Sequence, residues 1–102
     1  MSKEQLLATL RKNRSTLESE GVEHVALFGS FARAEEEAGS DVDVVVKLSE
    51  PVRQSGFGYF GALERLKAAI EHMTGRRVDI VAEPVQNARL RQEIERDRAI
   101  AF

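Results

Sequence analysis

The apolar residues follow helical and strand periods in turn along the chain, and this succession predicts the order α-β-α-β-α-β-α. Leucines recur at helical spacing behind Ser2 and Gln5, a pair that matches the capping box found at helix starts. Gly21 is expected to end this first helix. Runs of apolar and β-branched residues then predict strands over 22–28 and 41–48.

Weaker patterns predict the remaining elements. A short helix from 30 to about 37 is expected between the two strands. The longest helical pattern follows a glycine-rich loop and is expected to stop at Gly75. A third strand over 76–82 precedes a helix with its core at 88–99. The sequence therefore predicts a single α/β (α+β) domain over residues 1–102, with a small mixed sheet packed on helices.

Three aspartates lie in or beside the predicted strands. Asp41 and Asp43 share one face of an extended strand, with Cα atoms roughly 6.6 Å apart, while valines take the other face. Asp79 is the one acid inside the third strand, where an unpaired buried carboxylate would be costly. If the second and third strands are neighbours, all three carboxylates converge. Their repulsion favours a divalent cation, and oxygen ligands suit Mg²⁺ or Mn²⁺.

A candidate phosphate site precedes these acids. Gly29 and Ser30 end the first strand and offer backbone N–H groups and a hydroxyl to a phosphate. Arg33 follows one helical turn later, where its guanidinium could reach a triphosphate oxygen. An ion pair of Arg33 with Glu36 or Glu37 is the alternative interpretation.

Each motif also has a simpler explanation. Gly29 could only punctuate the strand and Ser30 could only cap a helix. Asp41 and Asp43 could be solvated acids beside a turn. We favour the site because these features occur together, with Asp79 in a later strand.

The amino-acid composition excludes several classes of function and binding site. The chain has 15 basic and 17 acidic residues, so its net charge of −2 gives no general attraction to nucleic acid. It has no cysteine, which excludes disulfides and thiolate metal sites. Its N-terminus lacks the apolar core of a signal peptide, and no apolar run reaches membrane-spanning length. We therefore expect a cytoplasmic protein without a membrane contact.

The segments 28–33 and 40–46, read as Phe-Gly-Ser-Phe-Ala-Arg and Ser-Asp-Val-Asp-Val-Val-Val, carry a family resemblance. Gly-Ser, ten residues and then Asp-Val-Asp resembles the signature of the DNA polymerase β nucleotidyltransferase superfamily. The residues of the two segments are most similar to those of its minimal nucleotidyltransferases (MNT). Many of these proteins are antitoxins paired with HEPN-domain toxins. A glycine is common in the family where this chain has Ala34, so the turn there is expected to differ.

The resemblance implies a polymerase-β-like fold and a Mg²⁺-dependent enzyme that moves AMP from ATP to a hydroxyl, such as a tyrosine of a HEPN partner. It assigns catalysis and metal binding to Asp41, Asp43 and Asp79. A partner chain or a second copy of this chain is expected to complete the site. The alternative is a non-catalytic antitoxin that neutralises its partner by covering it.

Two apolar segments carry less information. Phe57, Tyr59 and Phe60 lie in the glycine-rich loop, where core packing of the two phenylalanines is preferred over stacking on a nucleobase or docking a partner. The tail 99–102 is expected to pack back on the domain, with a protein interface as the alternative.

Overall fold

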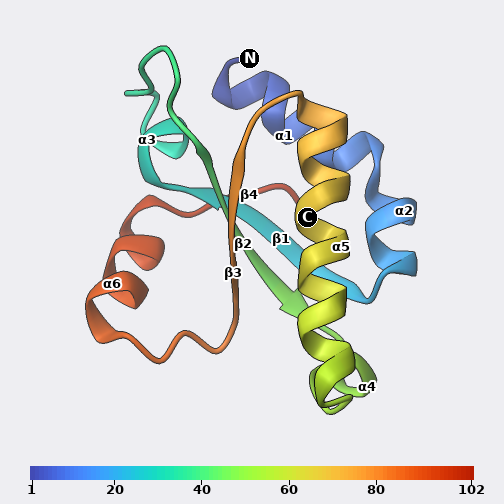
Figure 1. The fold of residues 1–102 in the computed structure, drawn as a ribbon. Coiled ribbons are helices and arrows are strands. Elements are labelled where there is room, and N and C mark those ends of the chain that lie inside the picture. The colour runs from blue at the N-terminus through green and yellow to red at the C-terminus, as the bar shows by residue number, and fades with distance from the viewer.

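The computed structural model describes residues 1–102 and shows a four-stranded mixed sheet between two groups of helices (Figure 1). The elements follow one another as α1 (Lys3–Lys12), α2 (Arg14–Ser19), β1 (Val22–Phe28), α3 (Gly29–Ala32), β2 (Val42–Leu48), α4 (Glu50–Arg53), α5 (Phe57–Thr74), β3 (Val78–Ala82), α6 (Ala88–Asp97) and β4 (Ala99–Ile100). The strand order is β3-β2-β1-β4, in which β2 and β3 are parallel and the other two pairs antiparallel. The predicted mixed α/β fold is confirmed.

The sheet has one fully covered face and one partly covered face. Alternate residues of β1 and β2 point to a core shared with α1, α2 and α5, which includes Leu27, Val44 and Leu66. The intervening residues point to α6, where Ala26, Phe28 and Val45 form a smaller cluster with Ile94. Figure 1 shows α6 on one side of the strands and α1, α2 and α5 on the other. None of the helices is both long and apolar enough to cross a bilayer.

The first helix begins as predicted and ends earlier. Ser2 Oγ accepts a hydrogen bond from the backbone N–H of Gln5 at 3.2 Å, and Gln5 Oε1 accepts one from the Ser2 N–H at 2.8 Å, which is the capping box. The helical pattern then breaks at Asn13, between α1 and α2. The Asn13 side chain donates to the carbonyl of Thr9 at 2.8 Å and so competes for a helical acceptor.

The helix after the first strand is one turn long and does not reach residue 37. It ends at Ala32 because Ala34 adopts a left-handed backbone with φ of 57°. An L-residue rarely takes this conformation, whereas glycine takes it without a steric cost. Ala34 therefore occupies a strained turn with a backbone geometry that glycine would favour; whether this turn differs from that of the family stays a prediction.

The C-terminal tail packs back on the domain, as expected, but it does so as a strand. Ile100 pairs with Ala26 and Ala99 with Leu27, so β4 forms the sheet edge next to β1. Arg11 fixes the tail from α1 by donating to the carbonyls of Ile100 and Ala101 at 3.0 and 2.8 Å.

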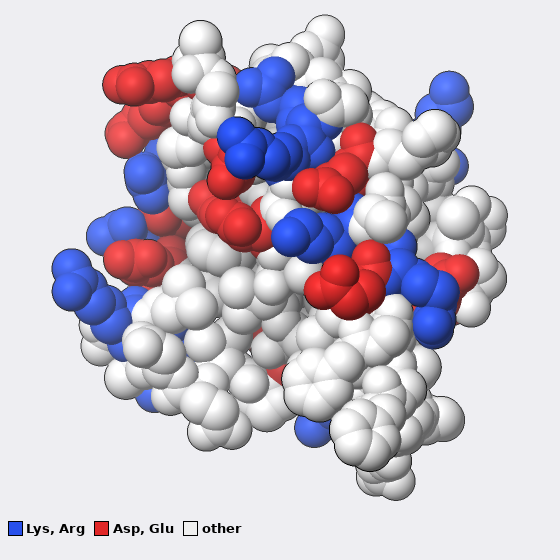
Figure 2. Space-filling model, in the orientation of Figure 1, with Lys and Arg blue, Asp and Glu red and all other residues white.

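The prediction that Phe57 and Phe60 pack in the core is wrong. The side chains of Phe57 and Phe60 are exposed, with 96% and 65% of their surface accessible. They occupy the first turn of α5, which extends past the end of the sheet together with the unpredicted helix α4 (Figure 1). The corresponding corner of the molecule carries few charges in Figure 2.

Candidate active site

The parallel pair of β2 and β3 places two of the three predicted carboxylates side by side. Asp43 and Asp79 are register partners, so their side chains project from the same face of the sheet at adjacent positions. Both line a cavity of about 560 Å³, within the range of small-molecule sites. Gly29, Ser30 and Arg33 line the same cavity. The structure thus brings five of the six predicted site residues to one place.

Gly29 allows the close approach of Asp43 to the first turn of α3. Its backbone has a φ of 72°, and a Cβ atom placed on it would overlap Oδ2 of Asp43. Only glycine satisfies both conditions without a shift of the carboxylate. The glycine therefore does more than end a strand.

Asp41 lies apart from this pair. It precedes β2 by one residue and lines a separate cavity of about 210 Å³ together with Arg76 and Arg77. Its Oδ1 atom is 3.9 Å from Nε of Arg77. In this conformation no three Asp, Glu, His or Cys side chains are grouped closely enough to hold a metal ion.

The expectation that Asp79 is a buried strand acid is wrong, since this residue is exposed. The reason is topological: β3 is an edge strand, and Asp79 points from it over the open cavity. The cost of burying an unpaired charge therefore does not apply to Asp79.

Asp43 is the electrostatically strained member of the pair. Its pKa is raised to about 6, first by burial and then by the nearby charges of Asp79 and Asp41. A divalent cation would relieve this repulsion, and carboxylate oxygens are the ligands that Mg²⁺ and Mn²⁺ prefer. Asp43 and Asp79 thus fit such an ion, and Asp41 is close enough to affect the pKa of Asp43.

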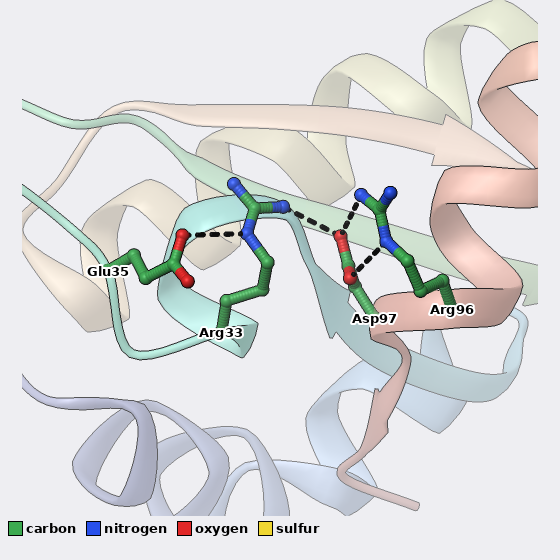
Figure 3. A network of polar contacts seen from close by, with 4 residues as sticks. All are labelled: Arg33, Glu35, Arg96 and Asp97. Atoms are coloured by element: carbon green, nitrogen blue, oxygen red, sulfur yellow. Dashed lines mark hydrogen bonds and ion pairs between the residues drawn. The ribbon is translucent and has the colours of Figure 1, made fainter.

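The ion pairs of Arg33 differ from the alternative interpretation, which named Glu36 or Glu37. Its Nε donates to Glu35 at 3.2 Å and its Nη1 to Asp97 at 2.7 Å (Figure 3), whereas Glu36 and Glu37 take no part. Arg33 still lines the cavity together with Ser30.

Helix α6 supplies a wall of the cavity that sequence reasoning missed. Leu90, Glu93 and Arg96 line it opposite the strand carboxylates. A signal was present, because Leu90, Glu93, Ile94 and Asp97 share one helical face. The acids on the apolar face of a mixed-charge helix mark a polar function for that face.

One face of the molecule carries charges of both signs. Figure 2 shows basic and acidic side chains interspersed on the face turned to the viewer, so this face lacks the continuous basic surface typical of nucleic-acid binding.

Comparison with known proteins gives the family. A model of the nucleotidyltransferase domain matches residues 7–102. A protein of Methanocaldococcus jannaschii that carries the provisional name protein adenylyltransferase (MJ1379) is 33% identical over 90 residues, which are 86% of each chain.

Solved structures show the same fold. A structure provisionally described as a minimal nucleotidyltransferase matches with a TM-score of 0.74 and 34% identity over 97% of this chain and 95% of that one. The MNT antitoxin in complex with a tri-AMPylated HEPN toxin of Shewanella oneidensis matches with a TM-score of 0.62 and 15% identity, over 94% of this chain and 71% of that one. On this evidence the chain belongs to the nucleotidyltransferase domain family and has the fold of a minimal nucleotidyltransferase.

Proposed function

We propose that this protein transfers AMP from ATP to a tyrosine hydroxyl of a HEPN-type partner and so acts as its antitoxin. The observation that carries the proposal is the register pair of Asp43 and Asp79 at the cavity that also holds Gly29, Ser30 and Arg33. Paired carboxylates next to a hydroxyl and a guanidinium can accommodate a cation and a phosphate chain together.

Asp43 and Asp79 would hold Mg²⁺ or Mn²⁺, and Asp41 would join them after leaving Arg77. The ion, when bound, neutralises the phosphate charges and the pyrophosphate leaving group. The hydroxyl and backbone of Ser30, with Gly29, bind the β and γ phosphates. No covalent intermediate with the protein is required.

Asp79 orients the acceptor hydroxyl and takes its proton. The acceptor oxygen then bonds to the α-phosphorus, while the bond between that phosphorus and the pyrophosphate oxygen breaks. The exposure of Asp79 at the sheet edge supports this role, because an acceptor from another chain can reach it.

The partner is proposed from the relatives. One carries the name protein adenylyltransferase, and one solved neighbour is an MNT antitoxin bound to an AMPylated HEPN toxin. The cavity is lined from β1, β2, β3, α6 and the segment from α3 to Arg33. The acceptor proposed for it is carried by a second chain, either a HEPN protein or another copy.

The ion pair of Asp41 with Arg77 favours a second candidate function. In this conformation Asp41 contacts Arg77 at 3.9 Å and is not grouped with two other metal-ligating side chains. If that arrangement is permanent, the protein is a binding antitoxin without catalysis.

Radiolabelled ATP separates the two functions. The protein is incubated with Mg²⁺ and a candidate HEPN partner, using ATP labelled at the α or the γ phosphate. Label on the partner from α-labelled ATP alone is the expected result. Transfer of γ label would indicate a kinase, and a neutralised partner without any label would establish the binding-only function.

A further inference from the structure

The C-terminal end of α6 contributes a second arginine to the cavity that contains Ser30 and Arg33, the residues proposed to bind phosphate. Arg96 lines the cavity together with Arg33, although the two residues are far apart in the sequence. Both guanidiniums bind the same carboxylate, that of Asp97, as Figure 3 shows. The two arginines therefore share one acid, Asp97, while Arg33 also binds Glu35.

Asp97 is well placed to fix both side chains. Its side chain is only 4% exposed, while those of Arg33 and Arg96 are 37% and 65% exposed. Arg96 binds it through Nε at 2.9 Å and Nη2 at 3.2 Å, a two-point contact, and Arg33 binds through Nη1 at 2.7 Å. The guanidiniums keep the pKa of Asp97 low, Arg96 most strongly, so the acid stays ionised.

Both arginines retain hydrogen-bond donors for a ligand. A guanidinium carries five N–H groups. Arg33 uses two of them on Glu35 and Asp97, and Arg96 uses two on Asp97, which leaves three on each. Planar donor sets of this kind match phosphate oxygens.

The charge of the cavity requires such donors. Its lining contains two arginines against three acids, Asp43, Asp79 and Glu93. A triphosphate would be repelled by the acids unless a cation covers the aspartates and the guanidiniums face the phosphate chain.

We propose that Arg96 and Arg33 bind the phosphate chain of the nucleotide as a pair, and that Asp97 is a positioning residue that holds both guanidiniums at the cavity. This inference rests on the proposed function for the identity of the ligand. It adds a binding residue and a positioning residue, both supplied by α6, to a site otherwise built from β1, α3, β2 and β3.

The test measures the dissociation constants of the full chain for a non-hydrolysable ATP analogue and for inorganic tripolyphosphate, each with Mg²⁺. Arg96→Gln is expected to weaken both ligands by about tenfold or more, because a charge-assisted hydrogen bond is lost. The control is Arg65→Gln, which breaks a 3.3 Å ion pair with Glu20 on the surface at nearly the same exposure, 63%. It should change neither constant.

Asp97→Asn tests the positioning role. It is expected to weaken both ligands by about three- to tenfold, and Asp97→Glu should restore part of the loss by keeping the charge. A melting temperature lowered in Asp97→Asn with unchanged affinity for both ligands would reduce Asp97 to a structural role and overturn its part of the proposal.

Three outcomes distinguish this inference from the proposed function. Affinity of Arg96→Gln within twofold of the wild type, or loss for the analogue alone, overturns the phosphate contact. Failure of the wild type to bind either ligand contradicts both claims. Arginine-dependent binding without AMP transfer supports the contact and contradicts the proposed activity.

Discussion

The carboxylate of Asp43 occupies the space that a side chain on Gly29 would need. The two residues lie at the facing ends of β1 and β2, where Phe28 and Asp43 are register partners. The turn that begins α3 and the Asp43 carboxylate of the proposed metal site are therefore in direct contact and depend on one another. A change at either residue should affect the other.

Gly29→Ala should lose the stabilisation that Mg²⁺ gives, because the new methyl group forces Asp43 to rotate. The left-handed backbone adds a loss of about 1 kcal/mol in the free energy of unfolding. Gly75→Ala is the matched control, since Gly75 has a similar φ of 69° and nothing within 4 Å of the added Cβ. Both variants should melt lower without metal. Equal stabilisation of both by Mg²⁺ in thermal unfolding would contradict the coupling of Gly29 and Asp43.

Mg²⁺ should raise the melting temperature of the wild type. At ten times its dissociation constant a bound ion adds about 1.4 kcal/mol, which corresponds to several degrees for a chain of this size. Asp43→Asn should abolish most of this shift while the fold persists. Glu64→Gln, at an exposed position of α5, should leave the shift unchanged. An unchanged shift in Asp43→Asn would remove this residue from the metal site.

The stability of the metal-free protein should fall as the pH rises from about 4 to 7. Asp43 has a pKa of about 6 in the fold against 3.8 ordinarily, so the folded state binds its proton more tightly and loses that advantage on ionisation. Because Asp43 is partly exposed, we expect an effect of about 1 kcal/mol. Chemical denaturation should find Asp43→Asn more stable than the wild type at pH 7.5 and equal to it near pH 4. A constant difference across this range would contradict the raised pKa.

Ala34→Gly should stabilise the protein by about 0.5–1 kcal/mol, because glycine adopts the φ of 57° at this position without steric cost. Ala38→Gly, in the same segment without a positive φ, should instead destabilise it slightly through the entropy of the unfolded chain. Urea unfolding of both variants checks the difference. Destabilisation by both would show that the turn at Ala34 is not strained.

Local sequence patterns predicted most of the helices and strands. They did not predict features that depend on contacts between distant parts of the chain. The capping box at Ser2 and the left-handed stop at Gly75 depend on neighbouring residues and could be predicted from the sequence. The two-residue strand β4 forms only by pairing with β1, and no short segment signals such a partner. Phe57 and Phe60 were misplaced because sequence does not show where the sheet ends.

The site follows the same rule. Strand periodicity placed Asp43 on one face, and the parallel neighbour brought Asp79 beside it. Arg33 was predicted at the site but with the wrong partners, since its strongest ion pair spans 64 residues to Asp97. The acids on the apolar face of α6 were a sequence signal, but the cavity that this face lines depends on how α6 packs against the sheet.

The most direct test of the account is the intact mass of the HEPN partner after incubation with this protein, ATP and Mg²⁺. We predict a gain of whole AMP units located on tyrosine by peptide fragmentation, at a rate that Asp43→Asn lowers at least about 100-fold and Glu64→Gln leaves unchanged. An unmodified partner with the wild type, or equal modification by Asp43→Asn, would contradict AMP transfer at the Asp43–Asp79 pair.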